Sequence, residues 1–124
     1  MRRLSSDSAV LTDEYAIRIG RWSQYAGTDG LPFQAMWCVV PPGGASAQDC
    51  HPEGELAVVV GGQAAFAVED GVPQPAPVGT AVLLDPEERH VIHNLSETEP
   101  LTLLSIYWLP QAHGTADEVT PDGR

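Results

Sequence analysis

The amino-acid sequence predicts an all-β fold of antiparallel strands. Its apolar runs are short and rich in β-branched and aromatic residues, and turn signals separate them. No segment repeats its apolar residues with the period of a helix, and 12 glycines and 11 prolines indicate many turns. About eight strands at this close spacing predict an antiparallel sandwich, a jelly roll or a small barrel.

The expected strands follow one another between residues 14 and 108. In chain order they are 14–22, 34–40, 55–60, 63–70, 80–85, 89–95 and 101–108, with the proline-rich segment 72–78 as a loop or a weak edge strand. A Pro-Pro-Gly-Gly run at 41–44 ends the second strand, and Gly61-Gly62 has the form of a two-residue hairpin turn. Asp70-Gly71 marks another turn, and Gly79 precedes the next strand.

The chain length suits one domain. A domain of 124 residues buries enough surface to form a core without disulfide bonds. We expect a flexible N-terminal segment at residues 1–12, a barrel at residues 13–109 and a flexible C-terminal tail at residues 110–124.

Charge and cysteine content limit the classes of partner. The formal net charge is −11, which argues against binding to nucleic acid or to an anionic membrane surface. No apolar run approaches the ~20 residues of a membrane helix, and no secretory signal follows the first residues. We therefore expect a cytoplasmic protein in which Cys38 and Cys50 are free thiols, with a disulfide between them as the alternative.

The first group of candidate ligands precedes the strand at 55–60. Asp49 and His51 are two residues apart, so on an extended strand their side chains share one face, and Cys50 points the other way. Glu53 and Glu55 follow with the same parity, although Pro52 and Gly54 are expected to bend the chain between them. Carboxylates and imidazoles are both metal ligands, and the alternative is a solvated acidic loop.

A second group lies in the segment 85–94. His90, Ile92 and Asn94 share one face of the expected strand, and His93 lies on the other face, where we expect it to be exposed. A barrel is able to bring this face beside the first group. The alternative for Asn94 is a turn former. Arg18 fits either a surface ion pair or the binding of an anionic substrate.

The first group resembles the first sequence motif of the cupin superfamily, which is Gly, five residues, His-x-His, three or four residues, Glu, six residues and Gly. The chain matches this spacing with Gly43, Asp49, His51, Glu55 and Gly62, and Asp49 stands at the position of the first histidine. The second group resembles the second motif, which is Gly, five residues, Pro-x-Gly, two residues, His, three residues and Asn, with Gly79, His90 and Asn94 in register. The Pro-x-Gly element is altered here, since Asp85 and Glu87 stand at its two ends.

The resemblance implies a double-stranded β-helix, which is a jelly-roll barrel. It also implies a divalent metal ion held by His51, Glu55 and His90, with Asp49 at the position of the missing histidine. Zinc or iron is expected first, and manganese or nickel would also accept these ligands. If three ligands suffice, Asp49 or Glu55 is free to act as the catalytic general base.

Three functions are consistent with the resemblance. The first is a metal-dependent enzyme for a small, amino-acid-like or carboxylic substrate. The second is a ligand-binding module with a vestigial metal site, which the replaced histidine favours. The third, suggested by the segments flanking the motifs, is a zinc cupin that forms a nitrogen–nitrogen bond together with a separate synthetase-like partner. Small cupins commonly pair, so a homodimer is expected.

Overall fold

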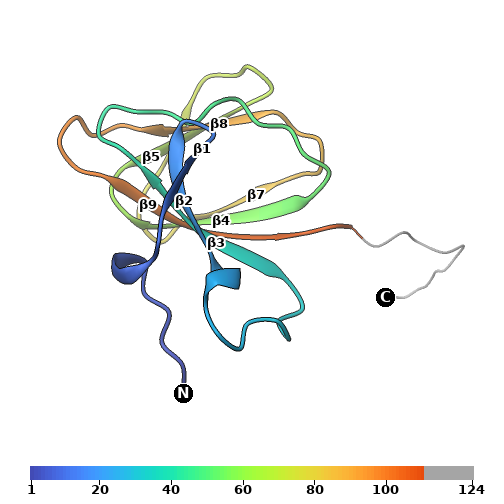
Figure 1. Cartoon of the computed structure of the whole chain (residues 1–124). Coiled ribbons are helices and arrows are strands. Elements are labelled where there is room, and N and C mark those ends of the chain that lie inside the picture. Colours follow the sequence, from blue (N-terminus) through green and yellow to red (C-terminus); the bar gives the residue numbers. More distant parts are fainter. Residues whose placement is uncertain (111–124) are drawn as a thin grey trace, which may run out of the picture.

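Two antiparallel sheets enclose one core in the structure, a computed structural model that describes residues 1–110 (Figure 1). The larger sheet has the order β1 (Thr12–Glu14), β2 (Ile17–Arg21), β3 (Gln34–Val40), β9 (Leu101–Trp108), β4 (Gly54–Gly61) and β7 (Ala81–Leu84). The smaller sheet has the order β6 (Gln74–Ala76), β5 (Ala64–Val68) and β8 (His90–Asn94). The all-β prediction is confirmed.

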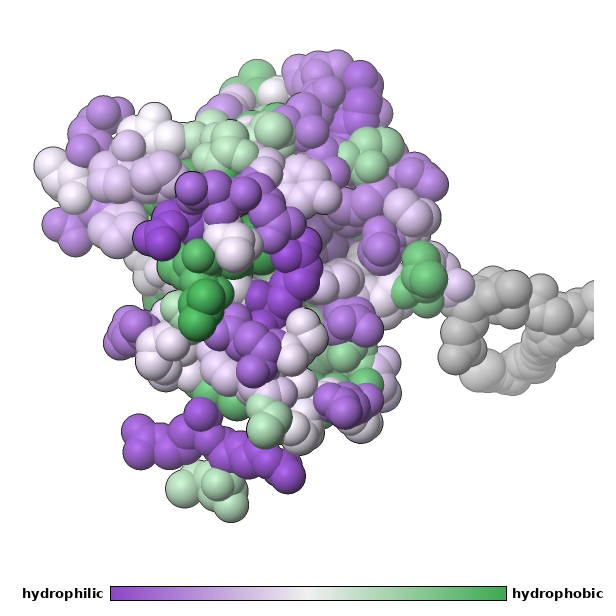
Figure 2. All heavy atoms as spheres, viewed as in Figure 1, coloured by the Kyte–Doolittle hydropathy of each residue, from purple (hydrophilic) through white to green (hydrophobic). Residues whose placement is uncertain are grey.

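Helical structure within residues 1–110 is limited to two short 3₁₀ helices, Ser6–Ser8 and Trp22–Gln24. Neither approaches the length that a membrane-spanning helix needs, and no such helix occurs in the described part of the chain. On the face drawn in Figure 2, hydrophilic side chains predominate and apolar ones are scattered among them, as the high net charge leads one to expect.

The core forms because alternate residues of each strand point inward. In β9, for example, Leu101, Leu103 and Ser105 are buried while the residues between them are half-buried. The buried cluster draws on both sheets and consists of Ile17, Ile19, Cys38, Val40, Ala57, Val59, Ala64, Phe66, Ala76, Ile92, Leu101 and Leu103. Burial of these side chains is the main favourable contribution to folding.

The single strand predicted for 14–22 is wrong in one respect. The segment is a hairpin in which Glu14 pairs with Ile17 across a two-residue turn at Tyr15 and Ala16. Both turn residues have positive φ, 54° and 64°, which such a tight turn requires and which asparagine or glycine usually supplies. The sequence carries neither residue there, so the turn has no recognisable signal.

The hairpin predicted at Gly61-Gly62 is also wrong. Strands β4 and β5 lie in different sheets, so this turn leads the chain from the larger sheet to the smaller one, and the strands on either side of it do not pair. Gly62 has φ 94°, and a Cβ atom there would lie 2.6 Å from the carbonyl oxygen of Pro100. The position therefore needs glycine for its conformation and for its close approach to the chain before β9.

The remaining predicted strands are confirmed: 34–40 and 101–108 match β3 and β9, 55–60 is one residue longer at each end in β4, and 80–85 and 89–95 are one residue shorter at each end in β7 and β8. The strand expected at 63–70 ends at Val68, because Glu69 and Asp70 turn with positive φ. The proline-rich segment 72–78 contains β6, a weak strand of three residues at a sheet edge. The domain boundaries stay a prediction: β1 begins at Thr12, β9 ends at Trp108, and the expected tail lies outside the described residues except for Pro110.

Asn94 ties the end of β8 to two other segments. Its side-chain nitrogen donates to the carbonyl oxygens of Val40, Pro41 and Glu99 at 3.1, 3.1 and 2.8 Å. Its side-chain oxygen accepts a hydrogen bond from the backbone of Ser96 at 2.9 Å, and the residue is buried. The expectation that Asn94 forms the turn after β8 agrees with these contacts.

We predict that Asn94→Ala lowers the free energy of unfolding by about 2–3 kcal/mol, because buried carbonyl groups lose their donor. Urea unfolding followed by circular dichroism measures the change. Glu97→Ala, an exposed substitution in the same loop, serves as the control and is expected to change stability by less than about 0.5 kcal/mol. An equal loss in both variants would contradict a specific role for the Asn94 side chain.

Candidate metal centre

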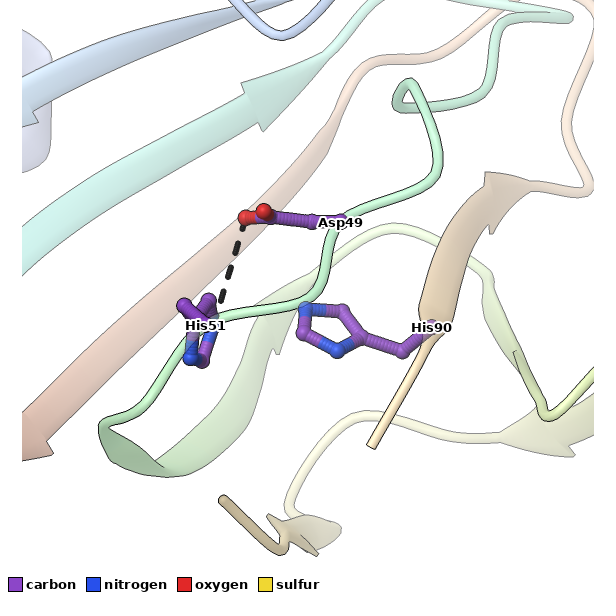
Figure 3. Close-up of side chains that lie close together, drawn as sticks. All are labelled: Asp49, His51 and His90. Atoms are coloured by element: carbon purple, nitrogen blue, oxygen red, sulfur yellow. Dashed lines mark ion pairs between the residues drawn. The ribbon is translucent and has the colours of Figure 1, made fainter. Parts of the chain in front are cut away.

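A backbone bridge brings the two candidate groups together. Asp49 and His90 form an antiparallel pair in which each backbone N–H donates to the other residue's carbonyl oxygen at 3.0 Å. Asp49 and His51 project from the connection between β3 and β4, and His90 is the first residue of β8 (Figure 3). Three side chains from distant parts of the sequence therefore point toward one space.

The ligand atoms of Asp49, His51 and His90 all lie within 4.8 Å of one another. The imidazole rings of the two histidines are 5.1 Å apart at their centres and meet edge to face at 71°. A nearby oxygen of Asp49 is 4.0 Å from Nε2 of His51. Ligand atoms about 2.1 Å from a tetrahedral ion lie about 3.4 Å apart, so side-chain shifts of about an ångström would bring these three groups onto one ion.

Backbone carbonyls orient both imidazoles in the same way. Nδ1 of His51 is 3.0 Å from the carbonyl oxygen of Glu53, and Nδ1 of His90 is 3.0 Å from that of Glu88. A carbonyl only accepts, so each Nδ1 carries the proton and donates it. This arrangement leaves the Nε2 lone pair of a neutral ring available to a metal ion, as in many metal-binding histidines.

Glu55 lies beside both rings. Its Oε1 is 3.1 Å from Nε2 of His51 and 3.8 Å from Nε2 of His90, and its Oε2 accepts a hydrogen bond from the hydroxyl of Ser105 at 2.7 Å. Only 4% of Glu55 is exposed, so this carboxylate is the most deeply buried acid of the group. The structure thus places Glu55 next to the cluster of three and in contact with its two histidines.

The electrostatics of the centre favour a positive charge. Burial of His51 opposes its protonation, but the carboxylates of Glu55 and Asp49 outweigh that effect and raise the pKa of its imidazole. Without a cation, a proton at His51 therefore offsets part of the negative charge. A divalent cation would meet the same need more fully.

The centre lines one side of a cavity of about 160 Å³ inside the barrel. The apolar wall of the cavity is continuous with the core, because four residues of the buried cluster also line the cavity: Ile17, Ile19, Cys38 and Ile92. Tyr107 lines the cavity, whereas Trp37 packs on the outside of its sheet against Trp22, with ring centres 5.6 Å apart.

Four other residues considered in the sequence lie outside the cluster of three ligand candidates. Arg18 makes an exposed ion pair with Asp13 at 3.8 Å and lies outside the cavity, in agreement with the surface alternative. His93 is half-buried rather than exposed, and its backbone pairs with Ala45 in the connection after β3. Cys50 points away from the centre and is exposed, and both cysteines are free.

Arg21 and Ser105 are polar residues of the cavity region that were not predicted from the sequence. Arg21 shares the parity of Ile17 and Ile19 in its strand, which was a usable signal for the inner face. Ser105 interrupts the apolar inward positions of β9 and is buried, so it needed a partner such as Glu55. Both signals depend on knowing which face of the strand is buried.

The altered Pro-x-Gly element keeps the backbone that a glycine would adopt. Glu87 has φ 63°, and its N–H donates to the carbonyl oxygen of His51 at 2.7 Å. The loop before β8 is thereby attached directly to a residue of the centre. Glu87 thus adopts a left-handed conformation, which is strained for a residue other than glycine.

Two imidazoles and one carboxylate make the donor set of a divalent transition-metal site, and the protons on Nδ1 direct both Nε2 atoms toward a metal ion. A bound ion would replace the proton that the 3.1 Å contact between Nε2 of His51 and Oε1 of Glu55 requires. The residues present therefore fit a metal ion. Glu55 completes a set of four if it binds as well.

A family model for the cupin domain matches residues 36–107. A cupin 2 conserved barrel domain protein from Salinispora arenicola is 30% identical, with 87% of this chain and 88% of that chain covered and a TM-score of 0.75. A protein from Photorhabdus luminescens is 28% identical, with 87% and 86% covered and a TM-score of 0.72. The comparison with curated proteins finds no match.

A conserved protein with a double-stranded β-helix domain from Klebsiella pneumoniae is 19% identical, with 86% of this chain and 89% of that chain covered and a TM-score of 0.69. At that identity the likeness shows the fold alone, and the predicted double-stranded β-helix is confirmed. Because the family model spans more than half of the 124 residues and the barrel from Salinispora is similar over nearly its full length, this chain belongs to the cupin superfamily.

Proposed function

We propose that this chain is a metal-dependent cupin enzyme that acts on a small, amino-acid-like or carboxylic substrate. The observation that carries the proposal is the convergence of Asp49, His51 and His90, whose ligand atoms lie within 4.8 Å of one another. Zinc or iron suits two imidazoles and a carboxylate best, and manganese or nickel would also be accepted. A bound ion would supply Lewis acidity for a carbonyl or carboxylate group, or an open position for oxygen.

The chain's own residues prepare the centre. The carbonyl oxygens of Glu53 and Glu88 keep the protons of His51 and His90 on Nδ1, so both Nε2 atoms face the space between the rings. Ser105 holds one oxygen of Glu55 and leaves the other beside the histidines. We propose Asp49, His51 and His90 as ligands, and Glu55 as the fourth ligand, with general base as its alternative role.

The size of the cavity limits the substrate. About 160 Å³ lies below the range of roughly 300–1,000 Å³ that is usual for drug-sized ligands. The walls combine an apolar side, which includes Met36 and Ile92, with the polar metal centre. A ligand of a few carbon atoms that carries a metal-binding oxygen or nitrogen suits this lining.

We also propose a cellular location and an oligomeric state for the protein. Two free cysteines support a cytoplasmic location. A homodimer stays a prediction: Val60 of β4 and Leu83 of β7 are 44% and 62% exposed on the larger sheet, where a second copy would cover them. Analytical ultracentrifugation is expected to give twice the monomer mass of 13.2 kDa, and a mass of one chain would contradict it.

A binding module with a vestigial metal site is the second candidate, favoured by Asp49 at the position of the motif histidine. Metal content distinguishes the two. We expect close to one equivalent of metal by mass spectrometry after purification without chelator, and under about a tenth of an equivalent would favour the module. The nitrogen–nitrogen-bond-forming cupin remains a narrower form of the enzyme proposal, tested by the metal-dependent formation of a hydrazine product with a candidate synthetase.

The first substitution that tests the centre is His90→Ala. Loss of one imidazole is expected to weaken zinc binding by at least about 100-fold, because even substitutions behind the ligands cost 10–100-fold. The matched control is His93→Ala on the same strand, whose side chain lies on the other face and outside the cluster. Calorimetric titration with zinc measures both, and unchanged affinity in His90→Ala would show that the centre is misassigned.

The second substitution is Glu55→Gln, which keeps an oxygen for Ser105 and removes the charge. If Glu55 is the fourth ligand, zinc affinity falls by about tenfold or more. Glu53→Gln removes a charge from the same cavity wall without removing one of the four ligand candidates, and we expect less than a threefold effect. Wild-type affinity in Glu55→Gln together with lost turnover would instead assign Glu55 as the general base.

A further inference from the structure

One arginine lines the cavity. Among its lining residues are three acids, Asp49, Glu53 and Glu55, and a single arginine, Arg21. The whole chain carries only six basic residues against 17 acidic ones, and all six are arginines. A guanidinium in the wall of a cavity that is otherwise acidic is therefore a specific feature and not part of a general basic surface.

Arg21 is held in a defined orientation. Its NH1 and NH2 nitrogens donate to the two carboxylate oxygens of Glu14 at 2.6 and 2.9 Å, which is a bidentate pair across the β1–β2 hairpin. The pair lowers the pKa of Glu14 to about 2. A guanidinium has five N–H groups, so Glu14 occupies one edge and leaves the other donors for a second partner.

Arg21 has a polar neighbour in the wall of the cavity. Tyr107 lines the same cavity. Burial raises the pKa of its hydroxyl, and the positive charge of the nearby Arg21 offsets part of that rise. Tyr107 lies opposite Glu55 on the neighbouring strand β4, so the tyrosine stands beside a residue of the metal centre. The arginine and the tyrosine together form the polar part of the wall outside the centre itself.

We propose that Arg21, with the hydroxyl of Tyr107, binds a carboxylate group of the substrate while another group of the same molecule reaches the metal centre. The inference rests on the proposed function and deepens it, because it names the substrate class: small molecules with a carboxylate at one end and a metal-binding group at the other. Arg21 is a substrate-binding residue in this scheme.

The charge of the site favours a carboxylate over a phosphate. A carboxylate carries one negative charge and matches the planar edge of a single guanidinium. A phosphate dianion would bring a second negative charge into a cavity that Asp49, Glu53 and Glu55 already line, with Arg21 as the one arginine in its wall. Like charges in such surroundings oppose binding.

The competing explanation is that Arg21 serves only to attach β1 to β2. Two substitutions separate the explanations, since each breaks the same ion pair. Arg21→Gln removes the guanidinium, whereas Glu14→Gln keeps it and frees the edge that Glu14 occupied. If the pair is only structural, both variants lose the same stability and neither changes the binding of anions.

The test compares malonate, succinate and glutarate with butyrate, a monocarboxylate, by calorimetric titration of zinc-loaded and zinc-free protein. We expect the best dicarboxylate to bind the zinc-loaded wild type at least about tenfold more tightly than butyrate, and Arg21→Gln to lose that preference at unchanged zinc affinity. Glu14→Gln is expected to bind the dicarboxylate as tightly as the wild type or more tightly.

Arg18→Gln is the matched control, since it removes an arginine of the same strand that points outward to Asp13. A preference that is absent in the wild type, or that persists in Arg21→Gln, would overturn the inference, as would an equal loss in Glu14→Gln. If the protein binds no zinc but carboxylates still bind in a way that depends on Arg21, the metal proposal fails and the anion site stands. Thermal unfolding checks that each variant is folded. If Arg21→Gln is not folded, the inference requires Glu14→Gln, which frees an edge of the guanidinium, to bind the dicarboxylate more tightly than the wild type, and unchanged binding there would overturn it.

Discussion

Two backbone hydrogen bonds between Asp49 and His90, each 3.0 Å long, determine where the chemistry of this barrel lies. The segment that leaves β3 runs antiparallel to β8: Asn94 donates to the carbonyl of Gly44, and Ser46 donates to that of Ile92, at 2.9 and 2.8 Å. It thereby covers the edge of β8 that β5 does not use. Opposed residues of such a pair have side chains on the same face, so the pairing alone sets a carboxylate beside an imidazole.

The polarity of the barrel interior changes along its length. One part is filled by aliphatic side chains, and the other holds Glu55, His90 and Ser105, which are all buried. Burying a carboxylate is costly unless it is hydrogen-bonded and paired. Ser105 and the two histidines provide part of that compensation for Glu55, and a bound cation would provide the rest. The buried carboxylate that lowers the stability of the fold therefore also makes the site favour a positively charged ligand.

Residue pattern alone predicted most of the strands and, through the resemblance, three residues that the structure brings together. The spacing of Gly43, Gly62 and Gly79 was informative because all three have positive φ, which few other residues adopt. The turn at Tyr15 and Ala16 could not be predicted, since its residues lack any preference for that conformation. The sheet change at Gly61-Gly62 was missed because a local pattern does not say which strands pair.

The missed turn also explains why Arg21 was overlooked. Ala47 donates a backbone hydrogen bond to the carbonyl of Tyr15 at 2.7 Å, and Glu14 binds Arg21 across the same hairpin. A left-handed residue other than glycine costs about 1–2 kcal/mol, so such a turn persists only where surrounding contacts maintain it. Tyr15 itself lines the cavity, so the strained turn belongs to the wall that faces the metal centre. The hairpin that local preference would not form is the element that gives the cavity its one arginine.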